Sequence, residues 1–590
     1  MKWSVAVGLT LWAYSLIHFY YFGIFAFALG IYFSWTTLRD NNFGVKVILN
    51  NLKHFAVQVL VAMVFFLYWI YWNDPIDDRC AEPWGFLYFH AELKGIFASP
   101  AQPYFSSVPY QKWDIENTAY LGAVAIMAGT VLVLIFLKNL FLKAPLKTES
   151  NHDFFLNNLW FTSIVILLVS FGLPFTVPGW EYMIEYVQPF EQFRSVGRFA
   201  WVAFYGFNIT AFYWLYTKGF KNNWWLAIPI ALLYFEAWNH TNHYDLWLDK
   251  VDEFEEGATF NDIEGIDYSE FQASVPIPYY NIGSGNFWID VTGFVGQKSQ
   301  TLAMQTGLPM TSAMLTRSSL SQAFKQLELV AEPYRLPKIL DDLPDDRPFL
   351  LVWDVTRARE FSPQYDHMNQ GLEMIYENYP LRFYRLPLET FEQRIAQRRA
   401  NLLTTFDQDT LLQVYPNNSD IDTSLTFLSQ DSVSYFLYKD WDGEQADKHY
   451  RGTGGYQGAF KDMASIIDED IPQGKYTLSF WMHIHEDLYP RTVMLLEEYD
   501  PESGSVLKQH IRPVHHHVAV IGEEGWGLVE MELEITQPGS RFRINTQHEK
   551  YRFKGRPLYI DELLIRPEGD TILFQKKNSL VENDRWFEFE

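Results

Sequence analysis

The stretch VQPFEQFRSVGRFAWVA, residues 187–203, places two arginines at the entrance to an apolar run that covers residues 199–216. Arg194 and Arg198 are four residues apart, so a helix that begins here presents both guanidinium groups on one face. Planar guanidinium groups donate paired hydrogen bonds to phosphate oxygens. At the edge of a membrane, such a pair suits a lipid phosphate headgroup. The stretch therefore predicts a phosphate-binding site beside a membrane helix.

Two simpler interpretations of the arginine pair stay open. Both side chains can extend along apolar surface and place only their charged ends in the headgroup layer. Alternatively, they can form ion pairs with Glu185 and Glu191, which lie close by in the sequence. The choice depends on which side of a membrane carries the pair.

Charge divides the 590-residue chain into two parts, and a chain of this length is expected to form two to four domains. Residues 1–240 contain 14 Lys+Arg and 14 Asp+Glu, so the whole net charge of −25 lies after residue 240. A neutral part rich in Trp and Phe, followed by an acidic part, indicates a membrane domain joined to a water-soluble region. The acidity disfavours nucleic acid as a partner, because nucleic acids bind basic surfaces. Cys80 is the single cysteine, which excludes an intramolecular disulfide and a cysteine zinc site.

Five apolar segments are long enough to cross a bilayer, at residues 54–72, 119–137, 159–177, 198–216 and 224–240. A further apolar run, residues 3–36, is too long for the core of a cleaved signal peptide and is expected to stay as an anchor. It fits either one long tilted helix or a broken pair, with the break expected between residues 18 and 23. The fold class expected for residues 1–240 is an α-helical transmembrane bundle of about six spans.

The distribution of Lys and Arg between loops predicts the orientation. The loops at residues 37–53, 138–158 and 217–223 contain eight basic residues. The loops at residues 73–118 and 178–198 are longer in sum and contain five. Basic loops stay in the cytoplasm, so we expect the C-terminal part outside the cytoplasmic (inner) membrane. Arg194 and Arg198 then lie on the outer side, where this rule does not favour them. Their position favours a functional role over simple extension toward the headgroups.

Acidic side chains expected on the same outer side are candidates for catalysis. Asp77 and Asp78 follow a span within NDPIDDR, and Glu116 precedes the next span. A carboxylate here can act as a general base or hold a divalent metal ion, the single cofactor that the sequence suggests. The alternative is a solvated Asp-Pro turn without chemistry. His18 and Tyr20 are candidates to line a lipid groove, because polar groups within membrane segments are commonly functional.

A charged linker, residues 241–258, is expected to join the spans to two water-soluble domains. The first domain covers residues 259–410. It contains short runs typical of buried strands, at residues 349–355 and 381–387. Helix-like stretches lie at residues 316–330 and 388–403. This combination indicates a small α/β domain. It contains neither a Gly-rich phosphate loop nor a nucleophile elbow.

The second soluble domain, residues 411–590, alternates strand-like runs with Gly, Asp, Asn and Pro turns, which is typical of a β-sandwich. Flat aromatic rings can stack on sugar rings, although core packing is the simpler role of a tryptophan. The candidates for sugar stacking are Trp441, Trp481 and Trp526. In the run of three histidines, only His515 and His517 share a strand face, so an exposed strand is favoured over a metal site.

Three pieces of residues 1–240 resemble the later part of the multi-spanning glycosyltransferases of the C superfamily. They are GLTLWAYSLIHFYYFGIFAF (8–27), TAYLGAVAI (118–126) and PFEQFRSVGRFAW (189–201). The resemblance implies an enzyme that moves a sugar from a polyprenyl-phosphate carrier to an acceptor on the outer face, with its catalytic acid in the first outer loop. The early spans and first loop of that family are not recognisable here. Either Asp77 or Asp78 fills the catalytic role, or the protein lacks the catalytic half, or the chain is a fragment whose start lies upstream.

Four pieces near the C-terminus resemble carbohydrate-binding modules with a jelly-roll fold. They are YRGTGGYQGAF (450–460), GKYTLSFWMHI (474–484), GWGLVEMELEI (525–535) and LYIDELLIRP (558–567). The resemblance implies a jelly-roll sandwich, and it says little about the ligand, because a fold does not fix a function.

Together, these observations predict a multi-domain integral membrane protein of glycan assembly. In the favoured hypothesis, it transfers a sugar from a polyprenyl-phosphate carrier, and Arg194 and Arg198 hold the phosphate. One acid among Asp77, Asp78 and Glu116 acts as the base, and the sandwich orients the glycan acceptor. In the rival hypothesis, the chain is a non-catalytic, membrane-anchored glycan-binding or assembly subunit that retains the fold.

Overall fold

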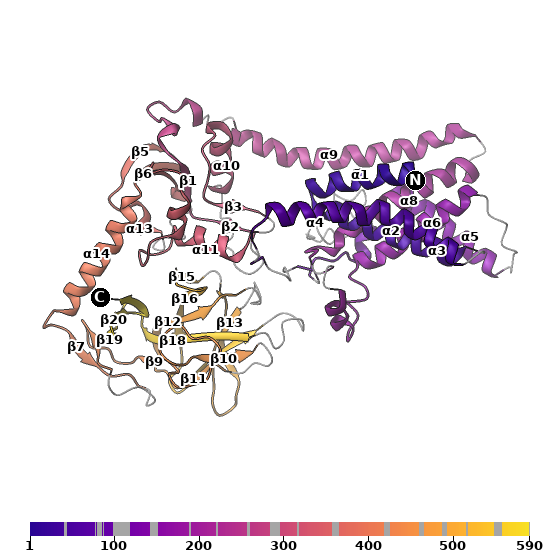
Figure 1. The fold of residues 1–590 in the computed structure, drawn as a ribbon. Coiled ribbons are helices and arrows are strands. Elements are labelled where there is room, and N and C mark those ends of the chain that lie inside the picture. Colours follow the sequence, from indigo (N-terminus) through magenta and orange to yellow (C-terminus); the bar gives the residue numbers. More distant parts are fainter. Residues whose placement is uncertain are drawn as a thin grey trace. The chain divides into compact units, whose positions relative to one another are not determined.

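The computed structural model describes residues 1–40, 44–76, 78–79, 85–86, 88–97, 118–141, 151–187, 190, 192–219, 222–255, 260–283, 289, 295–315, 318–356, 365–417, 425–459, 465–485, 493–514, 517–547 and 557–588. The chain folds into two compact units (Figure 1). Unit 1 comprises Met1–Pro75 and Gly85–Ala258, and unit 2 comprises Ile76–Trp84 and Thr259–Glu590. The helical and neutral part predicted from the sequence corresponds to unit 1, and every described strand of five sheets lies in unit 2.

Unit 1 is built from helices whose long members run along a common direction (Figure 1). The α-helices are α1 (Lys2–Ile17), α2 (Phe19–Arg39), α3 (Val45–Phe55), α4 (Val61–Asn73), α5 (Ala123–Phe141), α6 (Asn151–Ser170), α8 (Ala200–Trp214) and α9 (Ala227–Glu255). Two π-helical turns, η1 (Ala56–Leu60) and η6 (Leu215–Gly219), continue α3 and α8. Short 3₁₀ turns are η2 (Leu93–Ile96), η4 (Glu181–Val187), η5 (Val196–Phe199) and η7 (Asn223–Leu226).

The predicted break in the first apolar run is confirmed at His18. Its backbone is extended, with φ −161° and ψ 120°, so α1 ends at Ile17 and α2 begins at Phe19. The His18 ring accepts a hydrogen bond at Nδ1 from the Tyr20 backbone N–H at 3.2 Å, which caps α2. Close packing of α1 against η1 requires a glycine, because a Cβ at Gly8 would lie 2.6 Å from the Val57 carbonyl oxygen.

In the described part of the chain, two helices are long and apolar enough to cross a membrane: Phe19–Arg39, and the continuous helix Val45–Asn73. Residues Ala123–Ile135 of α5 and Phe154–Ser170 of α6 form shorter apolar helical stretches. By length and composition alone, the two long helices are weak evidence of a membrane protein, because the core helix of a soluble protein passes the same test. The structure therefore supports an association of this part of the chain with a membrane. It does not support the predicted count of six spans.

The α/β part of unit 2 contains a four-stranded sheet in the order β1 (Ala273–Ile277), β4 (Phe349–Asp354), β6 (Leu381–Leu386) and β5 (Glu373–Asn378). Strand β1 pairs parallel to β4, and the other neighbours are antiparallel. Its helices are α10 (Val295–Thr306), α11 (Leu320–Glu328), α13 (Asp366–Asn369) and α14 (Glu389–Phe406). Short elements are η8 (Phe260–Asp262), η9 (Tyr268–Glu270), η10 (Lys338–Asp342) and the pair β2 (Asn281–Ile282) and β3 (Ala313–Met314). Both predicted strands and both predicted helices are confirmed here.

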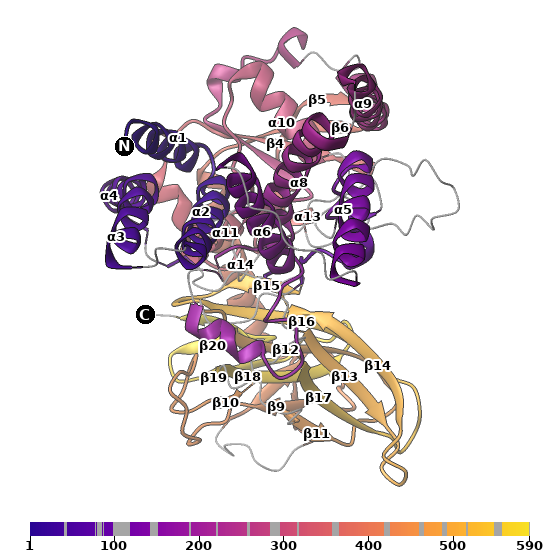
Figure 2. The same cartoon turned by 90° about the vertical axis from the view of Figure 1, so that its right-hand side faces the viewer.

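The C-terminal part of unit 2 is all β, as predicted (Figure 2). One sheet has the order β10 (Tyr456–Ala459), β18 (Pro557–Pro567), β12 (Gly474–His483), β16 (Trp526–Ile535) and β15 (Val518–Ile521), with β9 (Leu437–Lys439) also paired to β18. The second sheet is β11 (Ile467–Glu469), β17 (Arg541–Gln547), β13 (Val493–Tyr499) and β14 (Val506–Pro513). A third is β21 (Arg585–Glu588), β20 (Ser579–Glu582), β19 (Leu573–Lys576), β8 (Phe427–Ser429) and β7 (Leu412–Val414).

One continuous apolar core joins the two parts of unit 2. It contains Val275 and Leu351 of the α/β sheet together with Phe480 of β12 and Ile544 of β17. A shared core explains why residues 259–590 form one compact unit, where the sequence predicted two domains that meet near residue 410. The residues of the predicted linker up to Glu255 continue α9.

Candidate functional site

The stretch with the two arginines does not form the single helix face expected from its spacing. The 3₁₀ turn η5 begins at Val196, after an extended Ser195 with φ −133° and ψ 100°, so Arg194 precedes the helix and Arg198 lies inside it. The Gly197 N–H donates to the Phe89 carbonyl at 3.0 Å. Because an extended residue separates Arg194 from the turn that contains Arg198, the two arginines do not share one helix face, and that premise is wrong.

Tyr20 at the start of α2 holds the arginine stretch in place. Its hydroxyl accepts a hydrogen bond from the Ser195 backbone N–H at 2.8 Å, and its ring meets Phe193 edge-on at 5.1 Å. The Arg198 guanidinium carbon lies 4.9 Å from the centroid of the same ring, within cation–π range. Helix α2 also approaches closely at Gly23, where a Cβ would collide with the Phe193 ring. Helix α2 therefore orients Arg198 through one tyrosine.

Arg198 and Tyr20 line a cavity of about 960 Å³ inside unit 1. This size falls within the range of ligand pockets. Its polar lining consists of His18, Thr118, Arg198, Glu236 and His240. Aromatic side chains form much of the remaining wall: Tyr20, Tyr21, Phe25, Tyr120, Trp201, Phe204 and Tyr205. The cavity thus combines a guanidinium with broad apolar surface.

Glu236 on α9 is the acidic residue of this cavity, and the sequence analysis did not single it out. Its carboxylate accepts a short hydrogen bond from the Tyr120 hydroxyl. It also accepts from the Ala123 backbone N–H, at 3.0 Å to Oε1 and 3.2 Å to Oε2. Ala123 is the first residue of α5, so the negative charge faces a helix N-terminus, where it is stabilised. The signal was present in the sequence, as a carboxylate inside the apolar segment 224–240.

The structure brings some of the predicted site residues together and separates others. His18, Tyr20 and Arg198 line the same cavity, whereas Arg194 is not among its lining residues. Asp78 belongs to unit 2, where its carboxylate accepts from the Ser321 N–H at 2.6 Å in the first turn of α11. That bond caps a helix, so the geometry gives Asp78 a structural role.

Two further catalytic candidates, Asp77 and Glu116, lie outside the described residues. Among the residues that the structure describes, no group of three or more His, Cys, Asp and Glu side chains is arranged to hold a metal ion. Of the histidine run, His517 is described and lies just before β15.

The three tryptophans proposed to stack on sugars are buried, with exposed fractions of 4% for Trp441, 0% for Trp481 and 4% for Trp526. The Trp481 ring stacks on Tyr450 at 3.9 Å, and its Nε1–H donates to the Asp584 carbonyl at 2.7 Å. A ring that protein covers on its faces offers no surface to a sugar. The simpler role of core packing is therefore correct for all three.

Comparison with known proteins gives one family match. Residues 1–235 match a family described as "Domain of unknown function (DUF6311)". No curated protein matches the chain. The helical unit is thus similar to a family whose description states no activity.

Solved structures give low-level likenesses. One is the Clostridium thermocellum endo-1,4-β-D-xylanase 10B with its CBM22-1 and GH10 modules, complexed with xylohexaose, at 12% identity and a TM-score of 0.15. That match covers 27% of this chain and 28% of that chain. The C-terminal family 22 carbohydrate-binding module of the same enzyme matches at 12% identity over 28% of this chain and 89% of its own, with a TM-score of 0.15. The K3 adhesin domain of Lys-gingipain from Porphyromonas gingivalis matches at 12% identity over 26% and 99%, also with a TM-score of 0.15. At TM-scores this low, the matches are no basis for inferring a ligand or a function.

Proposed function

We propose that unit 1 is a multi-pass domain of the cytoplasmic membrane, with about six crossings, that binds the phosphate of a polyprenyl-phosphate carrier at Arg198. The protein then serves glycan assembly on the extracytoplasmic face, where unit 2 lies. The observation that carries this proposal is Arg198 itself, held over the Tyr20 ring at the wall of a cavity with aromatic sides.

Exposed apolar side chains support the membrane part of the proposal. On α4, Val64, Phe65 and Leu67 are each more than half exposed, and on α9 the same holds for Ile228 and Ile230. Water-soluble monomers rarely leave such large side chains uncovered in neighbouring turns. In a bilayer, the same surface contacts lipid and needs no protein partner. The exposed surfaces of these helices are therefore better suited to contact with lipid than with water.

The chemistry of the cavity supports a phosphate attached to an apolar chain. A guanidinium donates two parallel hydrogen bonds to phosphate oxygens, and these bonds strengthen where little water is present. Aromatic walls such as Trp201 and Phe204 offer apolar contact to an isoprenoid chain. The cavity can therefore hold both the phosphate group and the isoprenoid chain of one lipid.

Sugar transfer requires a base as well as a phosphate site. The base takes the proton of the acceptor hydroxyl, the hydroxyl oxygen bonds to the anomeric carbon, and polyprenyl phosphate leaves with the bonding electron pair. Glu236 is the acidic residue in the described lining of the cavity. However, both of its oxygens already accept bonds from the Ala123 N–H. This engagement favours the rival form of the proposal, in which the chain binds the carrier without catalysing transfer.

The experiment compares two single substitutions in the full-length protein, purified in detergent. Arg198→Lys keeps the charge and loses the planar guanidinium group that donates paired hydrogen bonds. We therefore expect about tenfold weaker binding of a polyprenyl phosphate. Arg194→Lys is the matched control and should bind as the unmodified protein does, because Arg194 does not line the cavity. Unchanged affinity in Arg198→Lys, with the protein folded, would reject the phosphate site.

A further inference from the structure

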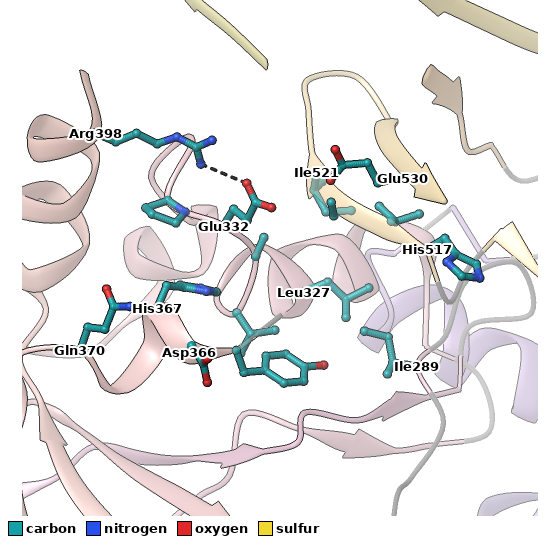
Figure 3. Close-up of a pocket in the computed structure, with 16 residues that line it drawn as sticks. Ile289, Leu327, Glu332, Asp366, His367, Gln370, Arg398, His517, Ile521 and Glu530 are labelled. Atoms are coloured by element: carbon teal, nitrogen blue, oxygen red, sulfur yellow. Dashed lines mark hydrogen bonds and ion pairs between the residues drawn. The ribbon is translucent and has the colours of Figure 1, made fainter. Parts of the chain in front are cut away.

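A second cavity, of about 770 Å³, lies wholly within unit 2. Figure 3 shows Asp366, His367 and Gln370 on its helical side. The opposite wall comes from the sandwich, where β15 contributes Val518, Ala519 and Ile521. The shared apolar core fixes these two walls against each other, so the cavity is part of one compact body.

Charged side chains at one end of the cavity are already neutralised by one another. Arg398 donates from Nη1 to Glu332 at 3.0 Å (Figure 3). Arg585 reaches Glu332 from Nε and Glu530 from Nη2, both at 2.8 Å. Arg566 donates to Glu530 at 2.8 Å. Because each carboxylate meets two guanidinium groups, these charges are held in fixed positions and offer little net attraction to an ionic ligand.

Apart from the Asp366 carboxylate, the remaining lining mixes amide and imidazole groups with apolar surface. The Gln370 amide and the imidazoles of His367 and His517 can both donate and accept hydrogen bonds. Between them lie Leu327 and Val330 on the helical side, across from the β15 side chains. A sugar presents hydroxyl groups at its rim and C–H groups on its face, and it matches such a lining on both counts.

We propose that this cavity binds a neutral oligosaccharide segment of the glycan that the protein handles. The inference rests on the proposed function in glycan assembly, and it names the site at which unit 2 meets the glycan. It replaces the three buried tryptophans as the location of sugar binding.

The test uses the full-length protein in detergent and an immobilised panel of neutral and acidic oligosaccharides. We expect binding to neutral members. Gln370→Ala removes a donor and acceptor, and Ala519→Phe fills the cavity from β15, so each should weaken that binding at least tenfold. Gln397→Ala is the matched control, because Gln397 is exposed on α14, bonds to Asn401 and does not line the cavity.

A melting curve for each variant separates loss of binding from loss of folding. Three results overturn the proposal. No neutral oligosaccharide binds to the folded protein, acidic members alone bind, or both cavity variants bind as tightly as the control. Polyprenyl-phosphate binding, measured on the same preparations, should be unchanged by the cavity variants. If Arg198→Lys leaves lipid binding intact while the cavity variants lose sugar binding, the lipid proposal fails and this one stands.

Discussion

The guanidinium carbon of Arg198 lies 4.9 Å from the centroid of the Tyr20 ring, and the hydroxyl of that ring accepts a bond from Ser195 at 2.8 Å. One side chain near the N-terminus thus fixes both the backbone that precedes η5 and the cation within it. The ring and the hydroxyl act on different groups, so their contributions can be separated by substitution.

Substitution of Tyr20 by two different residues separates the ring from the hydroxyl. Tyr20→Phe keeps the ring under Arg198 and should retain affinity for polyprenyl phosphate. It leaves the Ser195 N–H without its acceptor, which should lower stability by about 1–3 kcal/mol. Tyr20→Leu also removes the cation–π contact, and we expect a loss of affinity of several-fold, since such contacts contribute about 0.5–2 kcal/mol. Lipid titration and melting curves measure both effects, and equal affinities would argue that the ring does not orient Arg198.

The bond between Tyr120 and Glu236 predicts energetic coupling between two residues 116 positions apart. Tyr120→Phe removes the hydroxyl alone, and Glu236→Gln removes the charge that faces the α5 N-terminus. Each change should lower the free energy of unfolding, and the double variant should lose less than the two losses combined, with a coupling of about 0.5–3 kcal/mol. Denaturant unfolding in detergent gives all four values. Strict additivity would mean that the bond contributes nothing to stability.

The proposed orientation is testable by chemical labelling. Ser503 lies in the exposed turn between β13 and β14, so a cysteine there is accessible without disturbing the core. In a Cys80→Ser background, we expect Ser503→Cys to react with an impermeant thiol reagent once any outer membrane has been made permeable. The background protein without the new cysteine is the control. Labelling that occurs only after full lysis would place unit 2 in the cytoplasm.

Removal of Arg585 should destabilise unit 2 strongly. Its side chain is 6% exposed and contacts both Glu332 and Glu530. Arg585→Met leaves two carboxylates with fewer partners, and their side chains are 32% exposed in Glu332 and 21% exposed in Glu530. Breaking a buried ion pair typically costs about 3–5 kcal/mol, and we expect a loss of stability toward the lower end of this range. Lys325→Met is the control, because Lys325 pairs with Asp342 on the surface and should change stability little. A small effect in the first variant would show that neighbouring guanidinium groups compensate.

The same network predicts loss of stability in acid. Burial alone would raise the pKa of Glu530, but the guanidinium groups of Arg585 and Arg566 outweigh it and lower that pKa from 4.5 to about 2. The folded state therefore binds this proton less readily than the unfolded state. Its stabilising contribution is present above pH 4.5 and is lost as the pH falls toward 2. Melting midpoints across this range should fall more steeply for the unmodified protein than for Arg585→Met, which lacks the guanidinium that lowers this pKa most.

Local sequence patterns determined much of the framework. The polar, aromatic stretch at His18 predicted the break between α1 and α2, and apolar runs with turn residues predicted β4, β6, β12, β16 and β18. Capping chemistry also acts locally, as in α11, where Ser319 and Gln322 satisfy each other's backbone N–H groups. These features depend on residues within a few positions of one another, so periodicity and turn chemistry are sufficient to predict them.

Only the tertiary structure decided which side chains share an environment. Arg194 and Arg198 look equivalent in sequence, yet of the two Arg198 lines the cavity and Arg194 does not. Trp481 looks like a binding residue until Tyr450 covers its face. Asp78 meets Ser321 across 243 positions, and no local pattern encodes such a pairing. The physical reason is that burial and partnership follow from how distant elements pack, whereas sequence spacing fixes only the direction of a side chain on its own helix or strand.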